Sequence, residues 1–96
     1  MKYVLFFVGL LVLSAQARAQ QFNISGTVTQ NGERVEGASV YNKNTGKGSI
    51  TDANGNYSLN LEKGVYTIIF SFGNQVSKKI VLNEDLELNV DLANSQ

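Results

Sequence analysis

The chain has 96 residues, with eight basic and eight acidic side chains and no cysteine, histidine or tryptophan. That length allows one small domain. The absence of cysteine excludes a thiol nucleophile, a lipoprotein anchor and the disulfides that small exported domains often use. The absence of histidine excludes the usual general base and the usual zinc ligand.

The first 19 residues have the pattern of a secretory signal peptide. Lys2 supplies a positive charge, residues 3–13 form an apolar run broken only by Gly9, and Ala17-Arg18-Ala19 offers a small-x-small cleavage pattern. A membrane anchor is disfavoured, because spanning a bilayer takes about 20 apolar residues. We therefore expect export, cleavage after Ala19, and a mature domain over residues 20–96 without a transmembrane span.

Turn residues divide the mature chain into short runs of alternating character. Clusters of Gly, Asn and Asp recur at short spacing in a chain without proline. The runs between them are rich in β-branched and aromatic residues with a period of two, and none shows the 3.6-residue period of a helix. The sequence predicts an all-β sandwich or barrel with seven strands, near 22–29, 38–43, 48–51, 56–61, 65–72, 76–82 and 86–92.

Residues 65–72 are apolar on both faces, which is typical of a strand in the middle of a sheet. We place this run inside a sheet, since an exposed edge of this composition would promote aggregation. The side chains expected in the core are Ile24, Val28, Val40, Leu59, Ile68, Phe70, Ile80, Leu88 and Val90.

No pattern in the sequence indicates catalysis. There is no G-x-S-x-G and no P-loop, and the acidic residues fall mostly in turns and on polar strand faces. We expect no catalytic residue and no cofactor. No lysine-rich segment stands out, and six basic against eight acidic residues in the mature part argue against nucleic acid as a partner.

The segment 52–56 has oxygen-bearing side chains at alternate positions, Asp52, Asn54 and Asn56, as in a calcium loop. The match is incomplete, since Tyr57 stands where the loop glycine should be and Lys63 where the closing acid should be. A tight turn with Gly55 at positive φ is the favoured interpretation. A weak cation site at the same three residues is the alternative.

The order of these segments resembles the carboxypeptidase-regulatory-like domain. The similarity is carried by 24–28 (ISGTV), by 30–40 (QNGERVEGASV), by 48–59 (GSITDANGNYSL) and by 66–73 (YTIIFSFG). The usual prolines of the second segment are replaced by Glu33-Arg34 and Val35-Glu36, and Asn74 replaces a common tyrosine. The resemblance implies an immunoglobulin-like or transthyretin-like β-sandwich of seven strands.

In that family such domains are accessory, and many stand at the N-terminus of TonB-dependent outer-membrane receptors of Bacteroidota. There the order is signal peptide, this domain, TonB box, plug and barrel. The resemblance therefore implies a non-enzymatic module, periplasmic or associated with the outer membrane, that binds an envelope protein such as a TonB-dependent receptor. The alternatives are a structural spacer, the first part of a larger receptor, and, less favoured, a carbohydrate-active or peptidase-type enzyme.

An open sandwich has edge strands with unpaired backbone groups, which can accept a strand from a partner. Two turns that flank the short predicted strand 48–51 are expected to add contacts at one end of the domain. The predicted interaction residues in these turns are Asn44, Gly46, Lys47, Asp52, Asn54 and Asn56.

Overall fold

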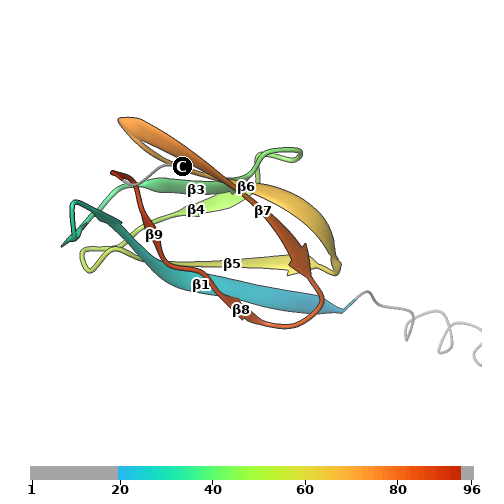
Figure 1. The fold of residues 1–96 in the computed structure, drawn as a ribbon. Coiled ribbons are helices and arrows are strands. Elements are labelled where there is room, and N and C mark those ends of the chain that lie inside the picture. The colour runs from blue at the N-terminus through green and yellow to red at the C-terminus, as the bar shows by residue number, and fades with distance from the viewer. Residues whose placement is uncertain (1–19, 94–96) are drawn as a thin grey trace, which may run out of the picture.

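The structure is a computed structural model that describes residues 20–93. Within this range the chain forms nine strands and no helix, and the strands make two sheets that lie face to face (Figure 1). The all-β sandwich is therefore confirmed. The predicted signal peptide, residues 1–19, lies outside the described residues.

The first sheet is built around β1 (Gln21–Gln30). Its antiparallel neighbour is β5 (Asn56–Glu62), and two short parallel segments, β8 (Leu86–Glu87) and β9 (Val90–Asp91), also pair with it. The two-residue strand β2 (Glu33–Arg34) folds back onto the end of β1. The turn between β1 and β2 is Asn31-Gly32, and both residues have positive φ, 56° and 82°. Positive φ at both central residues is the geometry of a type I′ hairpin turn.

The second sheet has the order β4-β3-β6-β7. Its strands are β3 (Ser39–Asn42), β4 (Gly48–Ile50), β6 (Gly64–Phe72) and β7 (Asn74–Leu82). All its pairs are antiparallel, and β6 lies between β3 and β7. The prediction of a central strand over residues 65–72 is confirmed.

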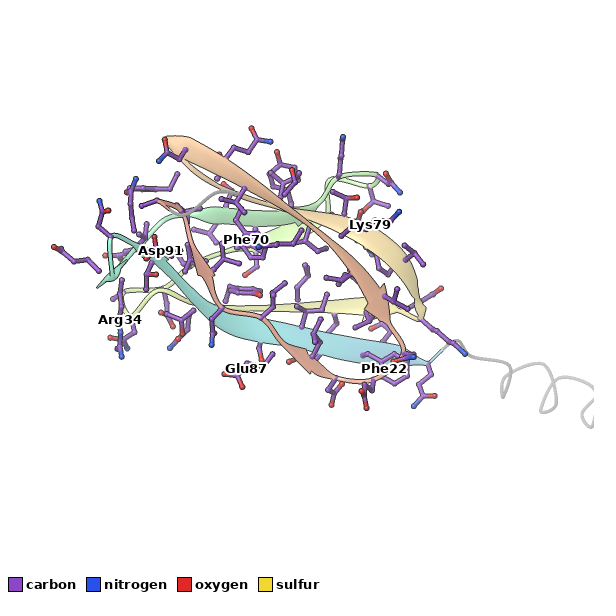
Figure 2. The ribbon with its side chains drawn as sticks, viewed as in Figure 1. Phe22, Arg34, Phe70, Lys79, Glu87 and Asp91 are labelled. Carbon is purple, nitrogen blue, oxygen red and sulfur yellow. The ribbon has the colours of Figure 1, made fainter. Side chains whose placement is uncertain are left out.

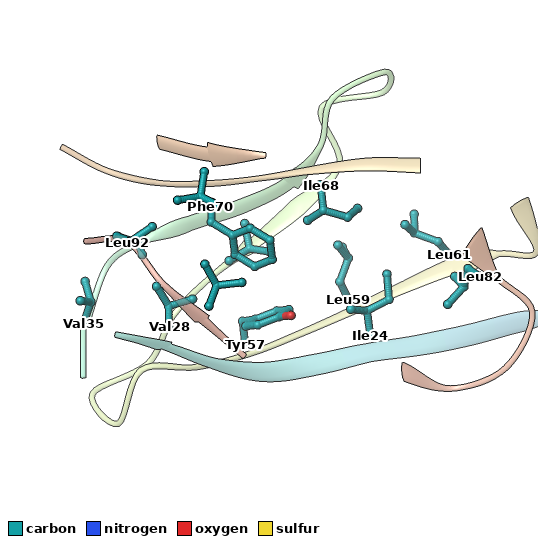
Figure 3. Packing of buried hydrophobic residues seen from close by; sticks show 14 residues of the cluster. Ile24, Val28, Val35, Tyr57, Leu59, Leu61, Ile68, Phe70, Leu82 and Leu92 are labelled. Carbon is teal, nitrogen blue, oxygen red and sulfur yellow. The ribbon is translucent and has the colours of Figure 1, made fainter. Parts of the chain in front are cut away.

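The core fills the space between the sheets with side chains that alternate along the strands (Figure 3). The Phe70 ring meets the Tyr57 ring edge-on, with centroids 5.5 Å apart and an interplanar angle of 76°. Two of the predicted core residues are only partly buried: Ile80, on the edge strand β7, and Leu88, in the connection between β8 and β9. Seven of the nine predicted residues are buried: Ile24, Val28, Val40, Leu59, Ile68, Phe70 and Val90.

The C-terminal segment differs from the single strand predicted over 86–92. It pairs with β1 as β8, leaves the ladder at residues 88–89, and pairs again as β9. In the gap the amide oxygen of Asn89 accepts a hydrogen bond from Thr27 N at 2.9 Å, so a side chain replaces a backbone carbonyl. A Cβ on Gly26 would lie 2.7 Å from the Leu88 carbonyl carbon, so this crossing requires glycine at position 26.

Candidate functional site

The first predicted interaction loop, residues 43–47, is the β3–β4 hairpin turn, and its polar groups bond within the turn. Gly46 N donates to Asn42 O at 2.8 Å, and Asn42 N donates to Lys47 O at 2.8 Å. The buried Asn42 side chain accepts from Asn44 N at 3.0 Å. Gly46 has a φ of 76°, which favours glycine. These contacts shape the loop and leave the exposed Lys43 and Lys47 side chains as its charged groups.

The second predicted loop, residues 52–56, is closed by its own aspartate. Asp52 Oδ1 accepts from Asn54 N at 2.9 Å and from Asn56 N at 3.0 Å, and Gly55 N donates to Asp52 O. Asn56 Oδ1 accepts from Thr27 Oγ1 at 2.9 Å. Of the three oxygen-bearing side chains, Asp52 closes the turn and Asn56 bonds to the neighbouring strand β1. Residues 20–93 hold no group of three acidic side chains that could bind a metal ion.

The segment that precedes this loop is fixed by a buried threonine. Thr51 Oγ1 accepts from Ala38 N at 2.9 Å and donates to Val35 O at 2.6 Å. Gly55 has a φ of 77° and would place a Cβ 2.8 Å from Val28 O. Each specified residue of the Thr-Asp-x-x-Gly-x-Tyr pattern at 51–57 therefore has a structural role. Thr51 fixes the preceding segment and Asp52 closes the turn. Gly55 permits the close approach to Val28, and Tyr57 packs in the core.

The structure does not bring the two predicted loops together. One precedes β4 and the other follows it, so they lie at opposite ends of this three-residue strand (Figure 1). The expectation that they form contacts at one end of the domain is wrong in this respect. Clusters of Gly, Asn and Asp predicted both turns, and turns that flank one short strand must lie at its two ends.

The buried polar groups in the described part of the chain all have partners, and their contacts are structural. The Tyr57 hydroxyl donates to Leu88 O at 2.6 Å, and burial raises its pKa above the ordinary value of 10.0. No buried side-chain nitrogen or oxygen within residues 20–93 lacks a hydrogen bond. One hollow of about 380 Å³, lined by Gln20, Phe22, Glu62, Lys63 and Asn83, contains a single carboxylate. General acid–base catalysis by a carboxylate pair needs two, so this hollow does not provide one.

The fold separates positive from negative charge by sheet. The second sheet and its turns, residues 37–50 and 63–82, contain no acidic residue and five lysines: Lys43, Lys47, Lys63, Lys78 and Lys79. The remaining described residues belong to the first sheet and its turns, with eight acidic residues and one basic residue, Arg34. Figure 2 shows Lys79 on the second sheet, with Arg34 and Glu87 on the first. Sequence reasoning missed this separation, because the lysines are dispersed along the chain and gather only when strands are assigned to sheets.

Two long strands have a free edge, β5 in the first sheet and β7 in the second, because each pairs with one neighbour only. The edge strand β7 carries Lys78 and Lys79, and lysines on an edge strand oppose pairing with another chain. The edge strand β5 carries no lysine. Of the two, β5 is therefore the better acceptor for an added strand.

The hydrogen-bond pattern of β1 shows which backbone groups of β5 face outward. Ser25 and Thr29 carbonyls accept from the C-terminal segment, while Val28 N donates to Gly55 O on the opposite side. Odd residues of β1 therefore bond to the C-terminal segment and even residues to β5. The registers Ile24↔Leu59 and Phe22↔Leu61 then leave the backbone N–H and C=O of Ser58 and Asn60 pointing away from β1.

A model of the CarboxypepD_reg-like domain family matches residues 24–96. The TonB-dependent receptor SusC of Bacteroides thetaiotaomicron is 33% identical over 95 residues, which cover 91% of this chain and 10% of the receptor. The TonB-dependent receptor P3 of Formosa agariphila is 31% identical over 88 residues, which cover 90% of this chain and 9% of the receptor. The chain thus spans about a tenth of the length of these relatives.

Solved structures share the fold at lower identity. A DUF3823 family protein from Parabacteroides merdae superposes with a TM-score of 0.61 at 20% identity, over 78% of this chain and 47% of that one. A chain from a type II cohesin–X–dockerin complex of Acetivibrio cellulolyticus gives a TM-score of 0.58 at 22% identity, over 72% of this chain and 52% of that one. These likenesses concern the sandwich alone. No helix within residues 20–93 is long and apolar enough to cross a membrane.

Proposed function

Because the chain belongs to the CarboxypepD_reg-like domain family, we propose that it is an exported, non-enzymatic accessory domain held against a TonB-dependent receptor. The observation that carries this proposal is the sequence match to two such receptors. The match covers about nine-tenths of this chain and about a tenth of each receptor. The geometry supports the non-enzymatic part, since the oxygens of Asp52, Thr51 and Tyr57 are engaged in turns and core contacts.

The proposed place of action is the periplasm or the periplasmic side of the outer membrane. The signal-peptide pattern of residues 1–19 supports export. The first strand begins at Gln21, so cleavage after Ala19 leaves every strand of the sandwich whole. N-terminal sequencing of the exported protein should therefore give Gln20 as the first residue, and an intact Met1 would contradict export by this route.

The proposed contact is the addition of an extended receptor segment to the free edge of β5. The outward N–H and C=O groups of Ser58 and Asn60 would form the new ladder, which supplies affinity through backbone hydrogen bonds. The exposed side chains of β5, among them Ser58 and Glu62, would contribute the selectivity. The Asp52 turn lies next to the start of this strand and can extend the contact.

The test is retention of the receptor by the full-length tagged chain in envelope extracts. Proline is tolerated on an edge strand where its nitrogen faces solvent. Asn60→Pro removes an outward donor, so it should abolish retention, whereas Asn60→Ala keeps the donor and should retain the receptor. Equal retention by the two variants, both folded by circular dichroism, would exclude the β5 edge as the contact. Hydrolysis of a peptide or a glycan by the purified chain would contradict the proposal as a whole.

A further inference from the structure

The outer face of the second sheet carries lysines among exposed aliphatic side chains, and we call it the lysine face. Across it, Lys43 N donates to Thr67 O at 2.9 Å, and Thr67 pairs with Lys79 in the ladder of β6 and β7. Side chains two residues apart share a face of a strand. Lys43, Thr67 and Lys79 therefore form one row across the face.

Apolar rows lie on both sides of this lysine row. On one side Val65 pairs with Val81, and these side chains are 56% and 69% exposed. On the other side Tyr41 pairs with Ile69, and beyond them Ile50 is 66% exposed on the edge strand β4. The positive charges of this face are therefore flanked on both sides by apolar side chains.

The outer face of the first sheet is polar, unlike the lysine face with its exposed aliphatic side chains. Its exposed side chains are polar and bond to one another, as when Asn23 Nδ2 donates to Ser58 Oγ at 2.7 Å and to Asn60 Oδ1 at 3.0 Å. The charged residues on this face are mostly acidic: Glu62, Glu87 and Asp91 are acidic, and Arg34, which pairs with Thr29, is the one basic residue among the described residues of this face. One face is therefore suited to water, and the other combines aliphatic groups with positive charge.

Edge protection accounts for only part of this pattern. Lysines on β7 discourage pairing with another strand, but Lys43 and Lys47 belong to the β3–β4 hairpin, and Lys63 lies in the turn before β6. A protein partner would also be expected to meet a different composition, since the centres of protein interfaces are depleted in lysine and enriched in arginine. No arginine occurs in the second sheet. Lysine acts as a hydrated point charge, which suits phosphate groups at a wet surface.

We propose that the lysine face docks the domain on a bilayer that contains anionic phospholipid. Lys43 and Lys79 lie against phosphate groups, with Lys47 as a further positive charge of the same sheet. Val65, Val81 and Ile50 enter the headgroup boundary, as the apolar face of other interfacial elements does. The acidic sheet then faces away from the membrane. This binding involves no receptor, so it goes beyond the function proposed above.

The test measures partition of the full-length chain onto protein-free vesicles. One set contains phosphatidylglycerol with phosphatidylethanolamine, and the other contains phosphatidylcholine alone. The variant Lys43→Gln/Lys79→Gln is compared with Arg34→Glu, because both lower the net charge by two but only the first alters the lysine face. All forms carry the same residues 1–19, so differences between them report on the mature domain.

We expect the parent to prefer the anionic vesicles and to lose binding as salt is added, because salt screens exposed charge. The double lysine variant should bind those vesicles about 25-fold more weakly, at about fivefold per lysine, which corresponds to about 1 kcal/mol for each basic residue near an anionic surface. Arg34→Glu should bind within about twofold of the parent if the lysine face alone contacts the lipid.

Three results would overturn the proposal. The parent could show no preference for anionic over zwitterionic vesicles, which would indicate that the face serves an acidic protein instead. The double lysine variant could bind like the parent. Arg34→Glu could weaken binding as much as the double variant, which would mean that only net charge matters. Because the vesicles contain no protein, each of these results leaves the receptor proposal untouched.

Discussion

At the scale of single residues, Phe70 is the largest fully buried side chain, and its ring contacts the Tyr57 ring at the centre of the core. We expect Phe70→Ala to lower the free energy of unfolding by about 3–5 kcal/mol, because it removes apolar contacts and leaves a cavity. Phe72→Ala on the same strand should cost under about 1 kcal/mol, since Phe72 is 45% exposed. Urea unfolding measures both. Similar midpoints for the two variants would show that Phe70 is not the centre of the core.

Asp91 ties the C-terminal segment to the β1–β2 turn. Its carboxylate accepts from Gly32 N at 2.9 Å, from Thr29 Oγ1 at 2.9 Å, from Ala93 N at 2.9 Å and from Asn31 N at 3.2 Å. The Gly32 amide, followed by the Thr29 hydroxyl, holds the pKa of Asp91 below its ordinary value of 3.8. Hydrogen bonds to the charged form of a carboxyl lower its pKa in this way.

This pKa shift makes stability depend on pH in the acid range. A lowered folded-state pKa means that the stabilisation is present above the unfolded pKa and is lost as pH falls through the folded value. We expect the urea midpoint of the parent to fall as the pH drops below about 4. Asp91→Asn should be less stable at neutral pH and should show a smaller decline below pH 4. Parallel pH profiles for the two proteins would mean that other carboxyls cause the acid sensitivity.

Single-residue patterns in the sequence predicted the core well where a side chain lies between the two sheets. Ile24, Val28 and Leu59 alternate with polar neighbours and are buried. The sequence could not predict the role of Asp91, whose partners Thr29 and Asn31 are about 60 residues away. It placed Ile80 in the core because alternation identifies the face of a strand, whereas burial also varies along that face, as the buried Val76 and Leu82 on the same strand show.

At the scale of elements, the C-terminal segment is held to β1 by backbone hydrogen bonds that alternate with side-chain hydrogen bonds. Leu88 N donates to Ser25 O at 2.8 Å, and Leu92 N donates to Thr29 O at 2.7 Å. The crossing between these points passes directly over Gly26. The sequence pattern predicts one strand here, since apolar and polar residues alternate throughout 86–92. The break between β8 and β9 results from the close approach of two backbones, which the local sequence does not indicate.

We expect Gly26→Ala to displace this segment from β1. Its Cβ would lie 2.7 Å from the Leu88 carbonyl carbon and 2.9 Å from Asn89 Oδ1, so the backbone must shift. The matched control is Gly64→Ala, whose nearest neighbour would be the Tyr66 side chain, with the Cβ 3.3 Å from its hydroxyl oxygen. Hydrogen exchange of the Leu88 and Leu92 amides should accelerate in the first variant and remain at the parental rate in the second. Unchanged exchange in Gly26→Ala would show that the crossing tolerates a methyl group.

At the scale of the whole molecule, the sandwich distributes its charged residues between the sheets in a way that alternation along the sequence does not predict. The motifs at 24–28, 48–59 and 66–73 sufficed to predict the fold, because they encode strands and the turns between them. The collection of five lysines on one sheet and its turns required the assignment of strands to sheets, because it depends on which strands are neighbours in space. The placement of the two predicted loops at opposite ends of β4 follows from chain order alone, because the loops flank that strand.

We propose that this domain acts by being held against a TonB-dependent receptor. The most direct measurement is lysine-directed cross-linking in intact outer membranes from cells that produce the full-length chain, followed by mass spectrometry. Lys63 directly follows the edge strand β5, whereas Lys43 and Lys79 lie on the face proposed to contact lipid. We predict cross-links from Lys63 to a TonB-dependent receptor and few from Lys43 or Lys79. A chain that reaches the outer membrane and forms no cross-link to any such receptor would contradict the claim.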